Sequence, residues 1–155
     1  WAYADALAAA TREGCFFCPE KVLQSTPRYP EEVLPGGRLE LGETLEAGLA
    51  REMIEETGLE VEVGPVIEVF DRILYDQDHR IRFHYVLIDY LCRPIGGTLQ
   101  AGSDVSEVAF AAPGDLPAYQ LTAKATAVIE RGFELARRHC WAGAKRDPGL
   151  PGPRP

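Results

Sequence analysis

Three glutamates are spaced so that, on a helix, their carboxylates would share one face: Glu52, Glu55 and Glu56. At about 100° per residue, counted from Thr44, Glu55 falls at about 20°, Glu52 at about 80° and Glu56 at about 120°. Like charges three or four positions apart repel, so a cation is needed to offset them. Carboxylate oxygens suit Mg²⁺ or Mn²⁺. The spacing therefore predicts a divalent-metal site, although most Glu-rich helix faces are simply solvated.

The segment that must position these glutamates has a helical pattern from Glu43 to Thr57 and a stop signal at Gly58. Just upstream, Pro35-Gly36-Gly37 allows bare backbone to approach a metal and to present a carbonyl. We therefore expect one helix and one glycine-containing turn to build the site together.

The rest of the chain predicts a sheet that is flanked by helices. Arg82 to Leu91 is apolar on both faces, as a central strand requires, and Leu121 to Cys140 is an amphipathic helix. We expect further extended segments at Val61 to Tyr75, interrupted by Gly64-Pro65, and at Val108 to Ala111, with turns at Asp76-Gln77-Asp78 and Gly96-Gly97. This order predicts a three-layer α/β/α sandwich around a mixed β-sheet, with an α+β fold as the alternative.

The N-terminal third carries weaker signals. Trp1 to Gly14 is Ala-rich with a weak helical pattern, Cys15 to Leu23 predicts a short hairpin, and Thr26 to Glu32 predicts a loop. The Pro- and Gly-rich tail is expected to be disordered. We thus predict a single domain over residues 1–142, of which residues 1–14 are an uncertain segment, followed by a tail at residues 143–155.

The composition limits the possible partners. The chain has 155 residues, enough for one compact core, and a formal net charge of -8, which disfavours a nucleic-acid binder that relies on a basic surface. It contains neither an uncharged apolar run of membrane-spanning length nor a signal-peptide pattern in its first residues. We expect a cytoplasmic protein without nucleic-acid or membrane partners, and a homodimer stays open.

The four cysteines, Cys15, Cys18, Cys92 and Cys140, are scattered through the chain. Cys15 and Cys18 form one CxxC, but neither a second CxxC nor paired histidines follow nearby to complete a zinc site. Reduced thiols are therefore expected.

The stretch from Gly37 to Leu59 resembles the Nudix box, GX5EX7REUXEEXGU, where U is aliphatic. Gly37 is followed after five residues by Glu43, and after seven more by Arg51-Glu52 and the aliphatic Met53. Glu55-Glu56 and then Gly58-Leu59 complete the motif. Every fixed position matches, so the chain is identified as a member of the Nudix (MutT-like) hydrolase family.

The resemblance implies an α/β/α sandwich and Mg²⁺- or Mn²⁺-dependent hydrolysis of a nucleoside diphosphate linked to another moiety. It implies metal binding by Glu52, Glu55 and Glu56, with a carbonyl of Gly36 or Gly37 as a further ligand. It assigns Arg51 to orienting a box glutamate and Glu43 to supporting the loop. The general base varies within the family. It is a box glutamate or an acidic residue before a late strand, where Asp104 and Glu107 lie and Glu107 is preferred.

The substrate is a small-molecule nucleotide of a type that the sequence leaves open: ADP-ribose, a dinucleoside polyphosphate or a nucleoside triphosphate. A tyrosine 16 residues past the box, here Tyr75, resembles a feature of diadenosine polyphosphate enzymes. Surface arginines and a histidine, Arg72, Arg80, Arg82 and His84, are left outside the site. Because the hairpin before the box is short compared with the family, the alternative is a Nudix-fold module that binds a nucleotide without hydrolysing it.

Overall fold

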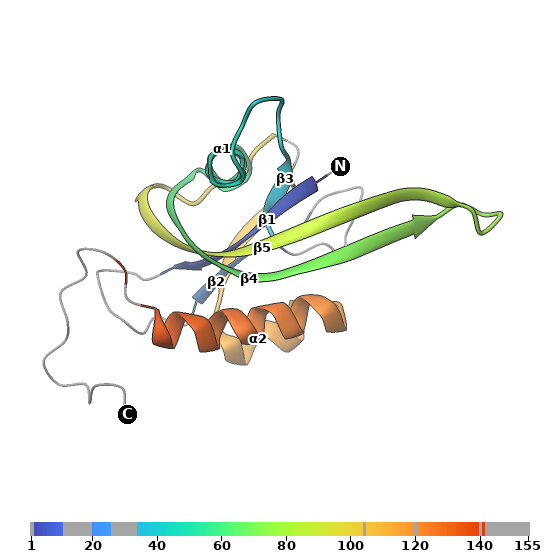
Figure 1. Cartoon of the computed structure of the whole chain (residues 1–155). Helices are drawn as coiled ribbons and strands as arrows, with labels where there is room; N and C mark the ends of the chain where they lie inside the picture. Colours follow the sequence, from blue (N-terminus) through green and yellow to red (C-terminus); the bar gives the residue numbers. More distant parts are fainter. Residues whose placement is uncertain are drawn as a thin grey trace, which may run out of the picture.

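The computed structural model describes residues 34–103, 105–119, 121–139 and 141 in full, and the backbone of residues 2–10 and 20–25. A sheet separates two helices, α1 (Leu45–Thr57) and α2 (Ala123–Arg138), which lie on its opposite faces (Figure 1). The predicted α/β/α sandwich is therefore confirmed. None of the helices in these residues is long and apolar enough to cross a membrane.

The strands run in the order β4-β5-β1-β2-β6, and β3 pairs with β1. β1 lies parallel to β5, while the other described pairs are antiparallel, so the sheet is mixed. The bounds of the strands are Ala2–Ala10 for β1, Glu20–Ser25 for β2, Gly36–Arg38 for β3, Leu59–Tyr75 for β4, Ile81–Gly97 for β5 and Glu107–Ala111 for β6. β5 is therefore an inner strand between β4 and β1, as its apolar faces predict, although β1 holds the middle position of the sheet.

Strands β4 and β5 are longer than the sequence predicts. The strand interruption expected at Gly64-Pro65 is instead a register shift between Val63 and Val66, after which the ladder with β5 continues. β5 likewise runs through Arg93 to Gly97. The two strands form one long hairpin whose far end projects beyond α2 (Figure 1).

The prediction of helical structure over Trp1 to Gly14 is wrong for Ala2–Ala10, which form β1. β1 lies parallel to β5 and pairs with Val86 to Cys92 of that strand. Alanine has the highest intrinsic helix propensity, but propensity is a weak local preference, and the long-range pairing with β5 outweighs it here. β1 thus adds a strand before the box, in addition to the short hairpin that the sequence predicts.

The expected N-terminal hairpin is only partly described. Val22 and Leu23 lie in β2 as predicted, but the described neighbours of β2 are β1 and β6. The remaining predictions lie outside the described residues: the first strand of that hairpin with Cys15 and Cys18, the loop from Thr26 to Glu32, Asp104, Cys140 and the C-terminal tail.

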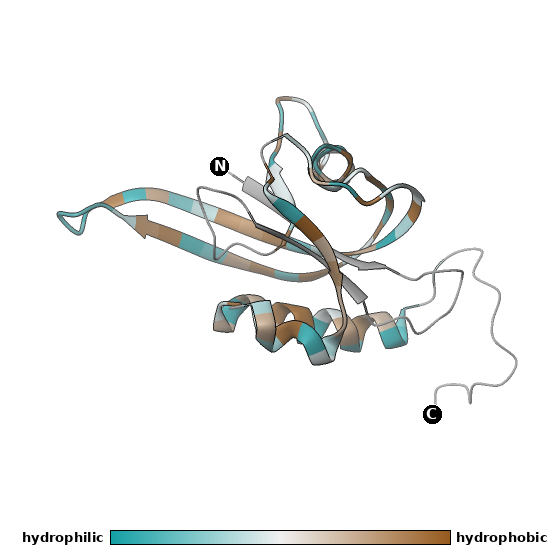
Figure 2. Ribbon diagram, turned by 180° about the vertical axis from the view of Figure 1, so that it is seen from behind, coloured by the Kyte–Doolittle hydropathy of each residue, from teal (hydrophilic) through white to brown (hydrophobic). Residues whose placement is uncertain are grey.

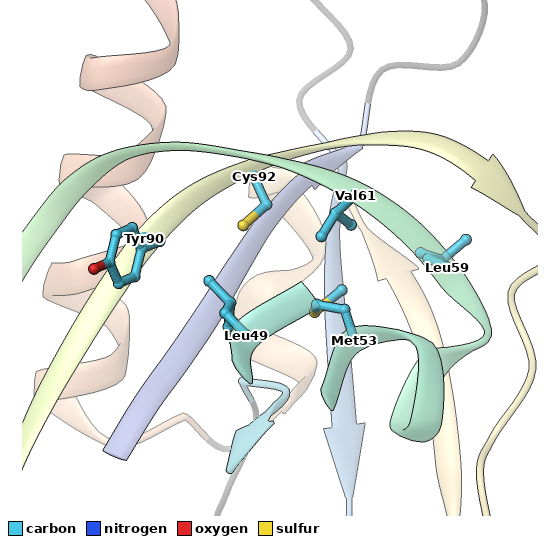
Figure 3. Close-up of a cluster of buried hydrophobic side chains, with 6 residues drawn as sticks. All are labelled: Leu49, Met53, Leu59, Val61, Tyr90 and Cys92. Atoms are coloured by element: carbon cyan, nitrogen blue, oxygen red, sulfur yellow. The ribbon is translucent and has the colours of Figure 1, made fainter. Parts of the chain in front are cut away.

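Each helix covers its own core. α1 inserts Leu49 and Met53 against side chains of β4 and β5, and all six residues of this cluster are buried (Figure 3): Leu49, Met53, Leu59, Val61, Tyr90 and Cys92. On the other face, Ile129 of α2 packs against Ala111 and Leu116. Leu116 belongs to the 3-10 helix Pro113–Tyr119. α2 thus buries one side against the fold, as the amphipathic pattern predicts.

Candidate active site

The glutamate-bearing helix begins and ends at the expected signals. The Thr44 hydroxyl accepts a hydrogen bond from the amide of Ala47 at 3.2 Å, which caps the N-terminus. Gly58 ends the helix in the left-handed conformation, with φ of 70°, and its amide donates to the carbonyl of Ile54. With Leu49 and Met53 fixed in the core, the rotation of the helix is set, and the Glu55 side chain is left exposed.

Arg51 joins three carboxylates around one guanidinium. Its Nε and Nη2 donate to the two carboxylate oxygens of Glu43 at 2.8 and 2.9 Å, in a bidentate pair. Its Nη1 donates to Glu52 at 2.9 Å and to Glu55 at 3.0 Å. A further bond from Nη2 reaches the carbonyl of Arg38 at 3.2 Å, just where β3 ends. The loop, the helix and β3 are therefore held together by one side chain.

This network shifts the acid–base behaviour of its members. The hydrogen bonds from Arg51, followed by that from the Glu40 amide, lower the pKa of Glu43 to about 2. The hydrogen bonds to Glu43 in turn hold the pKa of Arg51 above its usual range, against the opposing effect of desolvation. Both groups therefore keep their charges at every pH at which the protein would work.

Glu52 and Glu56 lie against the backbone of β3. A methyl group at Gly37 would come within 2.3 Å of the Glu52 carboxyl carbon, so only a glycine leaves room for this carboxylate. Glu56 is buried, and one of its carboxylate oxygens accepts a hydrogen bond from the amide of Gly36 at 2.7 Å. Glu55 differs from both, because its side chain is 57% exposed.

The donor set suits a hard divalent cation. Within the described residues, no group of three or more acidic, histidine or cysteine side chains is already arranged to hold a metal. Mg²⁺, however, usually binds through one or two carboxylates together with water and substrate phosphate. Glu52 and Glu56 provide two such carboxylates beside the same glycine backbone, and the Glu55 carboxylate is open to solvent. The residues therefore fit the cation that the family implies.

The loop between β5 and β6 is attached to the end of α1. The amides of Thr98, Gln100 and Gly102 donate to the last carbonyls of the helix segment, those of Gly58, Thr57 and Glu56, at 3.0 to 3.2 Å. These bonds satisfy carbonyls that a helix end leaves unpaired. Sequence reasoning missed this attachment, for which Gly102 was the available signal: a methyl group there would lie 2.0 Å from the Glu55 carbonyl oxygen.

The other predicted residues are more scattered. Glu107 is the exposed first residue of β6, and none of the hydrogen bonds and ion pairs described for this part of the chain joins it to the box. Tyr75 is exposed at the far end of β4. His84 bonds to Asp71 at 2.8 Å across the same hairpin. The structure thus brings Arg51 together with Glu43, Glu52 and Glu55, and it does not bring Glu107 or Tyr75 into contact with them.

Comparison with known proteins identifies the family. The family model for the Nudix domain matches residues 6–132, so the chain belongs to the Nudix family, as its box indicates. Among solved structures, the MutT Nudix hydrolase from Burkholderia pseudomallei is 26% identical, with a TM-score of 0.63, over 84% of this chain and 98% of that one.

Two curated relatives are similar over a shorter stretch. A protein of Methanocaldococcus jannaschii named ADP-ribose pyrophosphatase is 39% identical over 84 residues, which are 54% of this chain and 47% of the relative. A MutT-like protein of Streptomyces ambofaciens is 36% identical over 83 residues, 54% of this chain and 49% of the relative. The chain therefore spans about half the length of the curated relatives it matches.

Proposed function

We propose that this protein is a Mg²⁺- or Mn²⁺-dependent pyrophosphohydrolase that cleaves a nucleoside diphosphate linked to another moiety. The observation that carries the proposal is the placement of Glu52 and Glu56 against the Gly36-Gly37 backbone, while Arg51 fixes Glu52 and Glu55. ADP-ribose is the first substrate to test, because one relative is named for its hydrolysis. Dinucleoside polyphosphates and nucleoside triphosphates are the other classes.

In this mechanism Glu52, Glu55 and Glu56, together with the carbonyl of Gly37, would hold the cation. When bound, the cation neutralises the pyrophosphate oxygens and lowers the pKa of a water molecule. The water oxygen forms a bond to one phosphorus, and the bond from that phosphorus to the bridging oxygen breaks. The bridging oxygen leaves with its electron pair on the second phosphate, and the water gives its proton to a carboxylate.

Arg51 and Glu107 have roles other than binding the cation. Arg51 orients Glu52 and Glu55, because a planar guanidinium fixes both carboxylates relative to Glu43. Glu107 is our preferred proton acceptor, since the loop that precedes it is attached to the catalytic helix through Gly102. A box glutamate is the alternative acceptor.

We also propose that the substrate is a small-molecule nucleotide and that the protein acts in the cytoplasm without a nucleic-acid or membrane partner. The net charge of -8 supports this, because an anionic polymer would be repelled by the acidic surface. The argument for a silent binding module rested on a short N-terminal hairpin, and the nine-residue strand β1, which precedes that hairpin, weakens it.

The test is turnover of ADP-ribose, diadenosine polyphosphates and nucleoside triphosphates with Mg²⁺ or Mn²⁺, measured by chromatography of the products. Glu56→Gln keeps the side-chain volume but removes an anionic ligand, so kcat should fall by roughly a hundredfold or more. Glu46→Gln is the matched control, because Glu46 is an exposed carboxylate on the same helix, and its activity should be unchanged. Folded protein that hydrolyses none of the three classes with either metal would overturn the proposal.

A further inference from the structure

The projecting part of the β4–β5 hairpin carries most of the exposed large apolar side chains. Seven of the ten such residues in the described part of the chain lie on these two strands before Leu87: Val66, Val69, Ile73, Tyr75, Ile81, Phe83 and Val86. Hydrophobic colour covers much of both strands in Figure 2. A two-stranded ribbon is marginally stable in water by itself. The hairpin therefore has apolar surface to bury beyond the fold of one chain.

The outer edge of this hairpin is β4. Among the strands that the structure describes, β4 pairs with β5 alone, so it is an edge of the sheet. From Glu68 to Leu74 its ladder with β5 is regular. β4 carries no lysine, and its one proline is Pro65, at the base of the projecting part. Its outer half carries Glu68, Asp71 and Arg72, so a second strand can pair with it only where these charges are matched.

We propose that a second copy of this chain pairs with this edge, β4 antiparallel to β4, about a two-fold axis at Phe70. Residues that face each other in antiparallel strands share one side of the sheet. With Phe70 facing its own copy, Glu68 of each chain faces Arg72 of the other. Two ion pairs then form on the α2 side, where Lys124 and Arg131 already hold Glu68 at 2.6 and 2.5 Å.

The charges on β4 favour this pairing register over the registers with an axis at an adjacent residue. An axis at Asp71 would place two aspartates opposite each other, and an axis at Arg72 would place two arginines opposite each other. Both arrangements are destabilising. An axis at Val69 or at Ile73 forms neither ion pair. With the axis at Phe70, the regular stretch pairs from Glu68 opposite Arg72 to Arg72 opposite Glu68, and the register shift between Val66 and Glu68 interrupts it beyond.

The neighbouring helix leaves this edge open to a partner. α2 contacts β1, β4 and β5, so it lies across the sheet and does not run along the outside of β4. Arg51 and the box glutamates belong to α1 on the opposite face. The dimer is therefore compatible with a catalytic site in each copy.

Cysteine substitution tests the register. With Phe70 on the axis, the two α-carbons at this position lie roughly 4.5 to 5.5 Å apart, within disulfide range. The α-carbons of two copies of residue 71 lie diagonally, at about 7 Å or more. Oxidised Phe70→Cys should therefore form a covalent dimer on a non-reducing gel, and Asp71→Cys should do so no more than the unsubstituted chain, which controls for native cysteines. Equal cross-linking of the two variants would overturn the register.

Sedimentation equilibrium supplies a test that does not depend on folding of the cysteine variants. Arg72→Glu converts both ion pairs into like-charge pairs, so the dissociation constant of the dimer should rise about tenfold or more. Arg82→Glu is the matched control, since it makes the same charge change on exposed β5 and should leave dimerisation unchanged. A monomeric unsubstituted chain at roughly 100 μM, or equal weakening by both variants, would overturn the proposal.

Discussion

At the scale of single residues, Arg51 is the group on which the site depends most. Its guanidinium contacts four different partners at once, and its side chain is 24% exposed. An ammonium group is a point charge that cannot reproduce this planar fork. Exchange for lysine therefore keeps the charge but should release at least one of Glu52 and Glu55.

We predict that Arg51→Lys lowers kcat/KM by about 10- to 100-fold, the usual effect of removing an orienting contact. Loss of charge-assisted hydrogen bonds should also cost about 1 to 3 kcal/mol of unfolding free energy. Steady-state kinetics and denaturant unfolding measure the two effects. Arg138→Lys, at an exposed arginine of α2, is the control. Unchanged kinetics in Arg51→Lys would show that the glutamates are positioned without it.

A second residue outside the site should make stability depend on pH. Asp89 is 1% exposed, and its Oδ2 atom has no hydrogen-bond partner among the described residues. Burial, and then repulsion from Glu68 on the facing strand, raise its pKa to about 7, while Lys124 opposes the shift. The folded-state pKa lies above the unfolded value of 3.8, so the folded protein favours the neutral carboxyl more than the unfolded chain does. The resulting contribution to the free energy of unfolding is complete below about pH 4 and is lost as the pH rises through 7.

We predict that Asp89→Asn removes this loss. Between pH 4 and pH 7 the unfolding free energy of the native chain should fall relative to the variant, by at most about 4 kcal/mol, and above pH 7 the difference should stay constant. Denaturant unfolding of both proteins at several pH values measures it. The Glu43 carboxyl, whose pKa is lowered, loses its contribution only as the pH falls toward 2, and it does so equally in both proteins. A difference that does not vary with pH would contradict the prediction.

At the scale of elements, the short strand β3 makes room for the Glu52 carboxylate. Gly37 lies opposite Ala4 of β1 in the ladder, and its missing side chain makes room for the Glu52 carboxylate. A methyl group at this position must displace Glu52, while the backbone pairing of β3 does not depend on it.

We predict that Gly37→Ala lowers kcat/KM by at least about tenfold while the protein remains folded. Gly114→Ala is the matched control, because a methyl group at Gly114 would have no neighbouring atom within 4 Å. Thermal unfolding separates loss of fold from loss of activity. If the two alanine variants hydrolyse substrate equally well, the Glu52 carboxylate does not need its place beside β3.

The elements differ in how far the sequence alone predicts them. α1 was predictable because its start, its stop and its inward-facing Leu49 and Met53 all depend on residues within the segment itself. β1 was not, because alanine carries little strand signal and its conformation follows from pairing with Val86 to Cys92, some 80 positions away. The bulge at Gly64-Pro65 was predicted as an interruption for a related reason: only the partner strand shows that the ladder resumes.

At the scale of the whole molecule, the residue types of the site could be predicted but not its contacts. The spacing predicts that Glu52, Glu55 and Glu56 share a helix, and the structure adds that they differ, since Glu56 bonds to Gly36 and Glu55 is exposed. Such differences depend on β3 and on the loop that contact the helix. They come from tertiary packing, which no local pattern encodes.

The attachment of the β5–β6 loop to the end of α1 has a consequence for local opening. Because the amides of Thr98, Gln100 and Gly102 donate to helix carbonyls, they can exchange with solvent deuterium only when the loop separates from the helix. We predict that these three amides exchange at rates close to those of the last turn of α1, and far more slowly than the amide of Asp78 at the hairpin tip, which donates only to the exposed side chain of Asp76 among the described bonds. Mass spectrometry or NMR of the exchanging protein measures the rates. Exchange of the three amides as fast as that of Asp78 would mean that this loop, and with it the segment leading to Glu107, opens independently of the helix.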